Sequence, residues 1–82
     1  MFHVYILKLR DGSLYTGHTN DLQRRLGEHH HGRGSCYVKG RRPFTLIYTE
    51  AFETRPKAAK REAQIKKMSH ERKIALAQNY AI

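Results

Sequence analysis

Hydrophobic residues predominate in three short runs of the chain, near residues 2–7, 14–16 and 44–49. The first run is rich in β-branched and aromatic residues, which favour a strand. An Asp-Gly pair at 11–12 is typical of a tight hairpin turn, so we expect 14–16 to return beside the first strand. The third run has the same composition and predicts a third strand.

A helix is predicted directly after the second strand. Leu22, Leu26 and His29 recur at helical spacing behind the capping side chains of residues 19–21. The segment 32–43 is rich in glycine and arginine and contains no acidic residue, which is typical of an exposed loop.

Two more helices are predicted toward the C-terminus. Thr54, with a proline two positions later, has the features of an N-cap for a helix that runs to about residue 68, and Ser69 caps a last helix. The order β-β-α-β-α-α favours an α+β fold, in which a small three-stranded, antiparallel-rich sheet is flanked by helices. Because a chain of 82 residues supports one small core, we expect a single domain over residues 1–82.

Charge indicates the class of partner. The chain has 16 Lys and Arg against 7 Asp and Glu, a formal charge of +9, and this imbalance favours an anionic partner, nucleic acid above all. No apolar stretch approaches the roughly 20 residues of a membrane-spanning helix, and the one cysteine, Cys36, has no disulfide partner in the chain. We therefore expect a cytoplasmic protein with no membrane partner.

Two tyrosines are candidates for chemistry. If the first two strands pair across the turn, Tyr5 and Tyr15 lie on neighbouring strands and can present their hydroxyls to one cavity. The alternative is that both are ordinary half-buried strand aromatics. Gly17, placed between strand and helix, favours the first interpretation because glycine there allows a phosphate to approach the backbone and the helix N-terminus.

The first predicted helix contributes basic candidates. Adjacent helical residues point about 100° apart, so only one of Arg24 and Arg25 can face the sheet. Arg25 shares a face with Leu22 and His29, which predicts either a phosphate contact or a side chain that covers the core edge; Arg24 is predicted to point outward and contact phosphate. Three consecutive helical residues cannot bind one ion, so in the run 29–31 we expect His29 to act as an acid or base.

Glu62 is the most informative residue. It lies on the face of its helix, with Ala58 and Ile65, that should meet the sheet. An unpaired carboxylate there would carry a desolvation cost of several kcal/mol. Three alternatives resolve this: an ion pair with Arg25, an ion pair with Lys66 at i+4, or a role as ligand for Mg²⁺ or Mn²⁺.

In order and spacing these residues resemble the GIY-YIG nuclease superfamily, particularly its small stand-alone bacterial members. The resemblance rests on His-Val-Tyr at 3–5, Tyr-Thr-Gly at 15–17, Arg25, His29 and Glu62. The strings at 11–17, 40–43 and 61–66 are similar to those of the stand-alone group, and the likeness extends over roughly residues 2–77.

The resemblance implies a metal-dependent endonuclease that acts on DNA, with RNA as a possible second substrate and no small-molecule cofactor. The equivalents of Tyr5 and Tyr15 lie beside the scissile phosphate and that of Arg25 contacts it. The equivalent of Glu62 holds a single divalent ion, Mg²⁺ or Mn²⁺. Tyr15 is expected to accept the proton of the attacking water, directly or through Tyr5, His18 or His29, and the products carry 5′-phosphate and 3′-hydroxyl ends.

The sequence departs from the family pattern at three positions. His3 replaces the first glycine of one name-giving triplet, Thr16 replaces a branched aliphatic residue of the other, and His18 stands where some relatives have lysine. We assign no role to Asn79. Contacts to nucleic acid are expected from Gly17, His18, Arg24, Arg33, Lys39, Arg41, Arg42 and Lys66.

A non-catalytic module that binds DNA or RNA through its charge is the competing hypothesis. Glu62 argues against it, because a pure binder gains nothing from an acid in a phosphate-facing surface. A chain this short has little surface for reading bases, so we expect single-stranded or branched DNA, rather than a specific duplex sequence, as the substrate.

Overall fold

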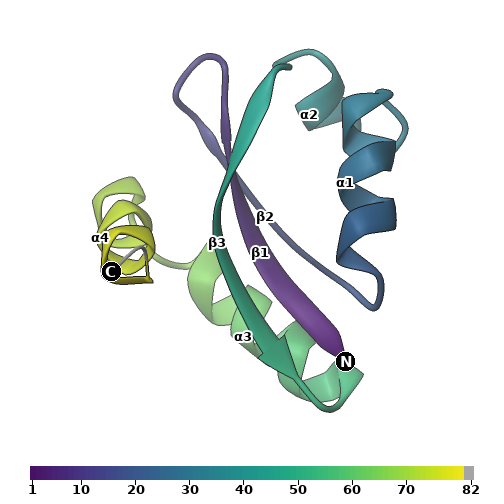
Figure 1. The fold of residues 1–82 in the computed structure, drawn as a ribbon. Helices are drawn as coiled ribbons and strands as arrows, with labels where there is room; N and C mark the ends of the chain where they lie inside the picture. The colour runs from purple at the N-terminus through teal and green to yellow at the C-terminus, as the bar shows by residue number, and fades with distance from the viewer. Residues whose placement is uncertain (81–82) are drawn as a thin grey trace.

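A three-stranded antiparallel sheet lies between helices on its two faces (Figure 1). The computed structural model describes the backbone of residues 1–80 and the side chains of residues 1–79. The strands are β1 (Phe2–Leu9), β2 (Leu14–Thr19) and β3 (Phe44–Phe52), in the order β2-β1-β3. The predicted α+β class is therefore confirmed, while residues 81–82 of the predicted domain lie outside the described residues.

Strand β1 is the centre of the sheet, and β2 forms one of its edges. Tyr5 of β1 pairs with Gly17 and Leu7 pairs with Tyr15, and Gly12 takes a positive φ of 85° in the turn that joins the strands. The expectation that the second strand ends before Gly17 is wrong. Pairing with β1 continues to Thr19, so Gly17 lies inside the strand.

Alternation along β1 divides the core between the two faces. Val4 and Ile6 pack with Ala58 and Ile65, whereas Tyr5 and its face of the sheet pack toward the first helix and the segment after it. Side chains of a strand point alternately to opposite faces, so the position of a site residue along its strand determines which face of the sheet its side chain occupies.

The three predicted helices are confirmed. They are α1 (Leu22–His30), α3 (Arg55–Lys66) and α4 (His70–Tyr80). Asp21 caps α1 by accepting a hydrogen bond from the Arg24 backbone N–H, and Thr54 caps α3 in the same way.

A short helix, α2 (Cys36–Lys39), interrupts the segment predicted to be an exposed loop. Ser35 caps it through the Tyr37 backbone N–H, and Val38 is fully buried. Burial of Val38 holds the turn in place, and a helix of four residues is too short to show a helical period in the sequence.

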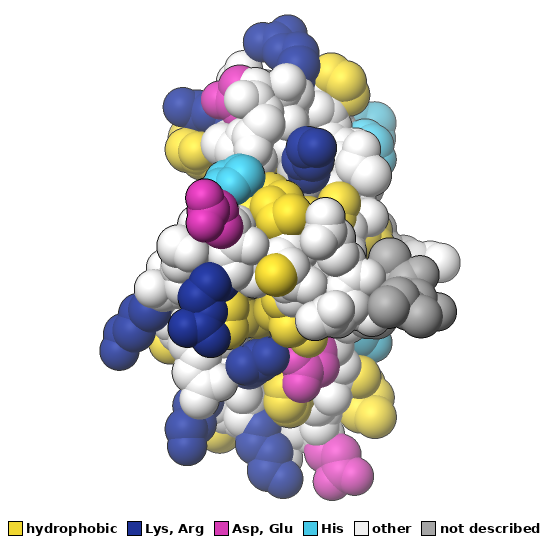
Figure 2. Space-filling view, turned by 90° about the vertical axis from the view of Figure 1, so that its left-hand side faces the viewer, with side chains coloured by type: hydrophobic (Ala, Val, Ile, Leu, Met, Phe, Trp, Pro, Cys, Tyr) yellow, Lys and Arg dark blue, Asp and Glu magenta, His cyan; other side chains and the backbone are white. Residues whose placement is uncertain are grey.

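The face formed by α3 and α4 is basic around an apolar centre. Figure 2 shows Lys and Arg side chains over much of this face, with hydrophobic side chains gathered near its middle. Among the residues that the structure describes, no helix has the length and hydrophobicity needed to cross a membrane.

Candidate active site

Tyr5 and Tyr15 lie next to each other on the sheet face that α1 covers. Their ring centroids are 6.3 Å apart, as the diagonal register of the pairs Tyr5–Gly17 and Leu7–Tyr15 requires. Tyr5 is 2% exposed, whereas Tyr15 is half-buried. The predicted neighbouring tyrosines are therefore present, with Tyr15 the more accessible of the two.

Gly17 provides room for these two rings. A Cβ atom at this position would lie 2.7 Å from the Tyr5 hydroxyl oxygen and 3.2 Å from a carbon of the Tyr15 ring. The predicted place of Gly17, between a strand and a helix, is wrong. The glycine inside β2 is explained by the tyrosines it lies against, and its contact with nucleic acid stays a prediction.

His29 of α1 lies against both tyrosines. Its Nε2 is 2.9 Å from the Tyr5 hydroxyl, and its ring meets that of Tyr15 edge-on at 5.4 Å. Burial, with the positive charge of Arg25, lowers the pKa of His29, so the imidazole is neutral near pH 7. A neutral ring beside a phenol can accept or donate a proton, according to its tautomer.

Burial shifts the pKa of the Tyr5 phenol in the opposite direction. It raises the pKa of Tyr5 well above its usual range, and the neighbouring Tyr15 and Glu62 add to the rise, while Arg25 opposes it. Tyr5 therefore keeps its proton at neutral pH and serves as a hydrogen-bonding partner, not as a free base.

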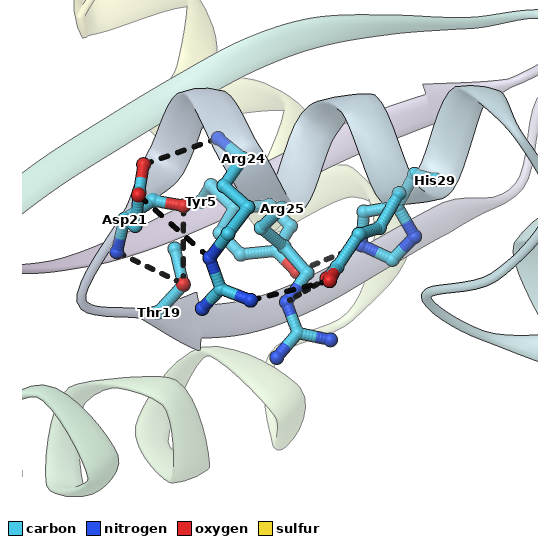
Figure 3. A network of polar contacts seen from close by, with 7 residues as sticks. Tyr5, Thr19, Asp21, Arg24, Arg25 and His29 are labelled. Atoms are coloured by element: carbon cyan, nitrogen blue, oxygen red, sulfur yellow. Dashed lines mark hydrogen bonds and ion pairs between the residues drawn. The ribbon is translucent and has the colours of Figure 1, made fainter.

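Arg25 extends from the same side of α1 as His29, as its spacing predicts (Figure 3). Its Nε lies 3.5 Å from a carboxylate oxygen of Glu28, yet this buried nitrogen has no hydrogen-bond partner within the described residues. The side chain is 34% exposed, so an arginine with unused hydrogen-bond donors borders the tyrosines. Such a group can bind a phosphate oxygen.

Arg24 points outward, as predicted. It forms ion pairs with Asp21 at 3.7 Å and with Glu28 at 3.2 Å, and 55% of its side chain is exposed. Exposed pairs of this kind are weak, so they leave the guanidinium free to exchange partners. Its contact with phosphate remains a prediction.

Glu62 lies on α3, beside strand β2. Its Oε1 is 2.6 Å from His18 Nδ1 and its Oε2 is 2.8 Å from Lys66 Nζ. Of the two ion pairs considered from the sequence, the pair with Lys66 is present and no direct contact with Arg25 is found in the described part of the chain. Although partial burial opposes it, hydrogen bonds from Lys66 and His18 hold the pKa of Glu62 below its usual range, so the carboxylate is ionised.

The His18 contact was missed in the sequence, although strand alternation could have indicated it. His18 pairs with Val4 and Gly17 pairs with Tyr5, so His18 faces α3 while the tyrosines face α1. His18 was expected to bind nucleic acid or to relay protons; the structure adds a direct bond to the proposed metal ligand.

The candidate site thus surrounds the β2 edge of the sheet from both faces. Tyr5, His29 and Arg25 lie on one side of this edge, and His18 and Glu62 on the other. No hydrogen bond or ion pair joins the two groups in the part of the chain that the structure describes, but they are close enough for Glu62 to raise the pKa of Tyr5 and for Tyr15 to raise that of Lys66.

The remaining predicted nucleic-acid contacts differ in their surroundings. Arg33 and Lys39 are exposed. Arg41 forms an ion pair with Asp11 at 3.1 Å, and Arg42 donates hydrogen bonds to the backbone carbonyls of Lys39 and His30. Arg42 therefore ties α1 to α2, and its role toward nucleic acid stays a prediction, as does that of Arg41.

The candidate site is not part of the apolar cavity beside α4. A cavity of about 500 Å³ lies between β3 and α4, lined by apolar residues such as Ile47 and Ile74, and it includes none of the predicted site residues. The candidate site lies instead at the β2 edge of the sheet, where Arg25 is 34% exposed and His18 is 23% exposed. These two side chains are therefore accessible to a polymeric substrate.

Comparison with known proteins agrees with this geometry. The sequence model of the GIY-YIG catalytic domain matches residues 1–75. A UPF0213 protein of Halobacterium salinarum is 47% identical over 76 residues, which are 93% of this chain and 99% of that protein. A UPF0213 protein of Staphylococcus saprophyticus is 46% identical over 74 residues, 90% of each chain.

Two solution NMR structures are similar to the whole fold. A UPF0213 protein from Bacillus halodurans matches with a TM-score of 0.61 and 42% identity, over 95% of this chain and 84% of that one. A protein from E. faecalis matches with a TM-score of 0.65 and 38% identity, over 96% of this chain and 84% of that one. With its match to the catalytic-domain model, the chain belongs to the GIY-YIG nuclease superfamily, among small relatives of the UPF0213 group.

Proposed function

We propose that the protein is a metal-dependent endonuclease that hydrolyses phosphodiester bonds of DNA, with single-stranded or branched substrates preferred over a specific duplex sequence. The observation that carries the proposal is the arrangement around the β2 edge. An arginine with unused donors, two adjacent phenols and an ionised carboxylate lie within electrostatic range of one another. These groups are what phosphate hydrolysis requires: charge stabilisation, a proton acceptor and a metal ligand.

Glu62 fits a hard divalent ion. Its carboxylate is ionised, 18% exposed and close enough to the tyrosines for its charge to act on them. Mg²⁺ and Mn²⁺ prefer carboxylate oxygen and often take only one or two protein ligands, so the absence of a cluster of three or more candidate ligands among residues 1–80 is compatible with such a site. When bound, the ion would offset negative charge on the phosphate and on the leaving oxygen.

Arg25, Tyr15 and Tyr5 have separate roles in the reaction. Arg25 binds the non-bridging phosphate oxygens. Tyr15, the more exposed phenol, first loses its own proton to solvent, a loss that the nearby positive charge of Arg25 favours, and its phenolate oxygen then receives the proton of the attacking water. Tyr5 keeps its proton because burial raises its pKa, so it orients its neighbours and passes a proton on only through its hydrogen bond to His29.

The positive surface supports binding of a nucleic-acid backbone. The net charge is +9, and Arg33 and Lys39 lie exposed in the region of α2, on the face of the sheet that carries the tyrosines. Because phosphate contacts do not read sequence, this surface favours selection by the shape of the nucleic acid. The expected products carry 5′-phosphate and 3′-hydroxyl ends.

A non-catalytic binding module is the second candidate. One observation favours it: both oxygens of Glu62 already have protein partners, His18 and Lys66. In that case Glu62 would serve to fix α3 against β2.

One assay separates the two functions. The protein is incubated with labelled single-stranded, duplex and branched DNA and with RNA, in Mg²⁺, in Mn²⁺ and in chelator. We expect cleavage of single-stranded or branched DNA with a divalent ion only, and its loss in Arg25→Ala and Tyr15→Phe. Binding without cleavage under every condition would favour the binding module, and cleavage that survives in all variants would indicate a contaminating nuclease.

A further inference from the structure

The geometry points to His18 as a second ligand of the divalent ion, so that the site is a mixed imidazole–carboxylate pair that prefers a first-row transition ion to Mg²⁺. This inference rests on the proposed function, since it concerns the metal that Glu62 would hold. Its starting observation is the distance of 2.6 Å between His18 Nδ1 and Glu62 Oε1, across 44 positions of the chain.

The distance between the two donor atoms is close to the distance between two ligands of one ion. Two ligands at about 2.1 Å from a metal and at right angles lie about 3 Å apart. The pair therefore needs to open by only a few tenths of an ångström from its 2.6 Å contact. Both side chains are partly accessible, at 23% for His18 and 18% for Glu62, so water and a phosphate oxygen can reach the ion as its remaining ligands.

Binding of a metal at His18 Nδ1 requires the ring proton to move to the other nitrogen. Without metal, Nδ1–H donates to the Glu62 carboxylate; with metal, the Nδ1 lone pair is required, and the proton moves to Nε2. His18 Nε2 has no protein partner in the described part of the chain and is not a buried unsatisfied atom, so water can solvate an N–H there.

The second carboxylate oxygen is already held. Lys66 Nζ lies 2.8 Å from Oε2, and this contact can remain while Oε1 binds the ion. Lys66 then fixes the carboxylate from behind, as partners of metal ligands commonly do.

The donor types determine which ion is preferred. Mg²⁺ favours an all-oxygen shell, whereas imidazole nitrogen raises the affinity for transition ions, with Mn²⁺ bound more weakly than Co²⁺. A lysine at position 18, as in the relatives noted above, could not ligate. The inference is therefore particular to chains that carry histidine at this position.

Binding of Mn²⁺ to the protein alone tests the inference without any measurement of activity. Wild type, His18→Gln, His18→Lys and Glu62→Gln are titrated with MnCl₂ while free Mn²⁺ is followed by continuous-wave EPR. Pulsed EPR then records coupling of the bound ion to ligand ¹⁴N. His31→Gln is the matched control, because His31 is exposed, and circular dichroism verifies the fold of every variant.

We expect a directly bound ¹⁴N in wild type and in His31→Gln, and its loss in both His18 variants, with Mn²⁺ affinity weaker by about 10-fold or more. Competition with MgCl₂ should show that wild type prefers Mn²⁺ and that His18→Gln prefers it less. Absence of ¹⁴N coupling in the Mn²⁺ complex would overturn the inference and leave the nuclease proposal standing. No Mn²⁺ binding by wild type at millimolar concentration would overturn the inference and would also count against the metal site of the proposed function. Unchanged Mn²⁺ binding in Glu62→Gln would instead count against the metal site of the proposed function itself.

Discussion

At the scale of single residues, the site depends on side chains that are packed too closely to move. Tyr5 is buried between β1 and α1, so its ring cannot move away from a larger neighbour, and the Tyr5 hydroxyl has one described partner, His29. Gly17 is the residue that makes this packing possible, since a methyl group there would overlap the Tyr5 hydroxyl. Small changes at these positions should therefore have large effects.

Gly17→Ala should disrupt the site and destabilise the fold. The added Cβ would lie 2.7 Å from the Tyr5 hydroxyl oxygen and 2.9 Å from the ring carbon that bears it, and overpacking of this kind costs about 1–3 kcal/mol. Gly27→Ala is the matched control, because its Cβ meets nothing within 4 Å and alanine favours a helix by up to about 1 kcal/mol. Urea unfolding of both variants checks this, and a Gly17→Ala protein as stable as wild type would contradict the packing account.

His29 should make the protein less stable in mild acid. Its folded-state pKa is lowered, mainly by burial, while the unfolded chain has a histidine pKa of about 6.5. Below that pH the unfolded state binds more protons, so the contribution to stability is complete above about pH 6.5 and is lost as the pH falls.

Thermal melts of wild type and His29→Gln between pH 7.5 and 5 test this effect. The variant is expected to be less stable at pH 7.5, because the bond to Tyr5 changes, but to lose less further stability toward pH 5. Equal slopes for the two proteins would show that His29 titrates normally in the folded state.

At the scale of elements, the basic segment between α1 and β3 has two kinds of arginine. Arg42 binds backbone carbonyls at the ends of α1 and α2, at 2.7 Å from the His30 oxygen and 3.0 Å from that of Lys39, which satisfies acceptors that a helix end leaves free. Arg33 is exposed and forms no ion pair within residues 1–80. Because both arginines lie in one Gly- and Arg-rich segment, the sequence pattern did not indicate this difference.

Replacement of each arginine by alanine should separate stability from binding. Arg42→Ala should lower the stability by about 1–2 kcal/mol, because two hydrogen bonds are lost. Arg33→Ala should leave the melting temperature unchanged and weaken binding to single-stranded DNA. Thermal melts and fluorescence anisotropy on the same preparations measure both effects, and a destabilised Arg33→Ala would contradict this division.

The elements also show what a sequence can and cannot predict. The three strands, the three longer helices and the helix caps Asp21, Thr54 and Ser69 followed from local patterns, because strand composition, helical spacing and capping are properties of neighbouring residues. Helix α2 and the extension of β2 to Thr19 did not, because one depends on burial of Val38 and the other on pairing with β1. For the same reason the bond between His18 of β2 and Glu62 of α3 was not anticipated.

At the scale of the whole molecule, the excess of positive charge determines how a substrate approaches. A net charge of +9 on 82 residues attracts nucleic acid over long range, and contacts to phosphate release counterions. The class of partner was predictable from composition alone. The exact arrangement of the phosphate contacts was not, since several basic residues are engaged within the protein.

Affinity for single-stranded DNA should fall steeply with salt. Each phosphate contact contributes about 0.7 to the slope of log K against log salt concentration, so several contacts give a slope of about −2 or steeper. Anisotropy titrations between 50 and 300 mM NaCl, in chelator to prevent cleavage, measure it. Affinity independent of salt would rule out binding through this surface.

The central claim is that the carboxylate of Glu62 serves hydrolysis at the β2 edge and is not only part of an ion pair with Lys66. The most direct measurement is single-turnover cleavage of a labelled single-stranded or branched DNA in Mn²⁺ by wild type and Glu62→Gln, with Lys57→Gln on the exposed face of the same helix as control. The account predicts loss of cleavage by about 100-fold or more in Glu62→Gln alone, with DNA binding retained. Cleavage at the wild-type rate by a folded Glu62→Gln protein would contradict it.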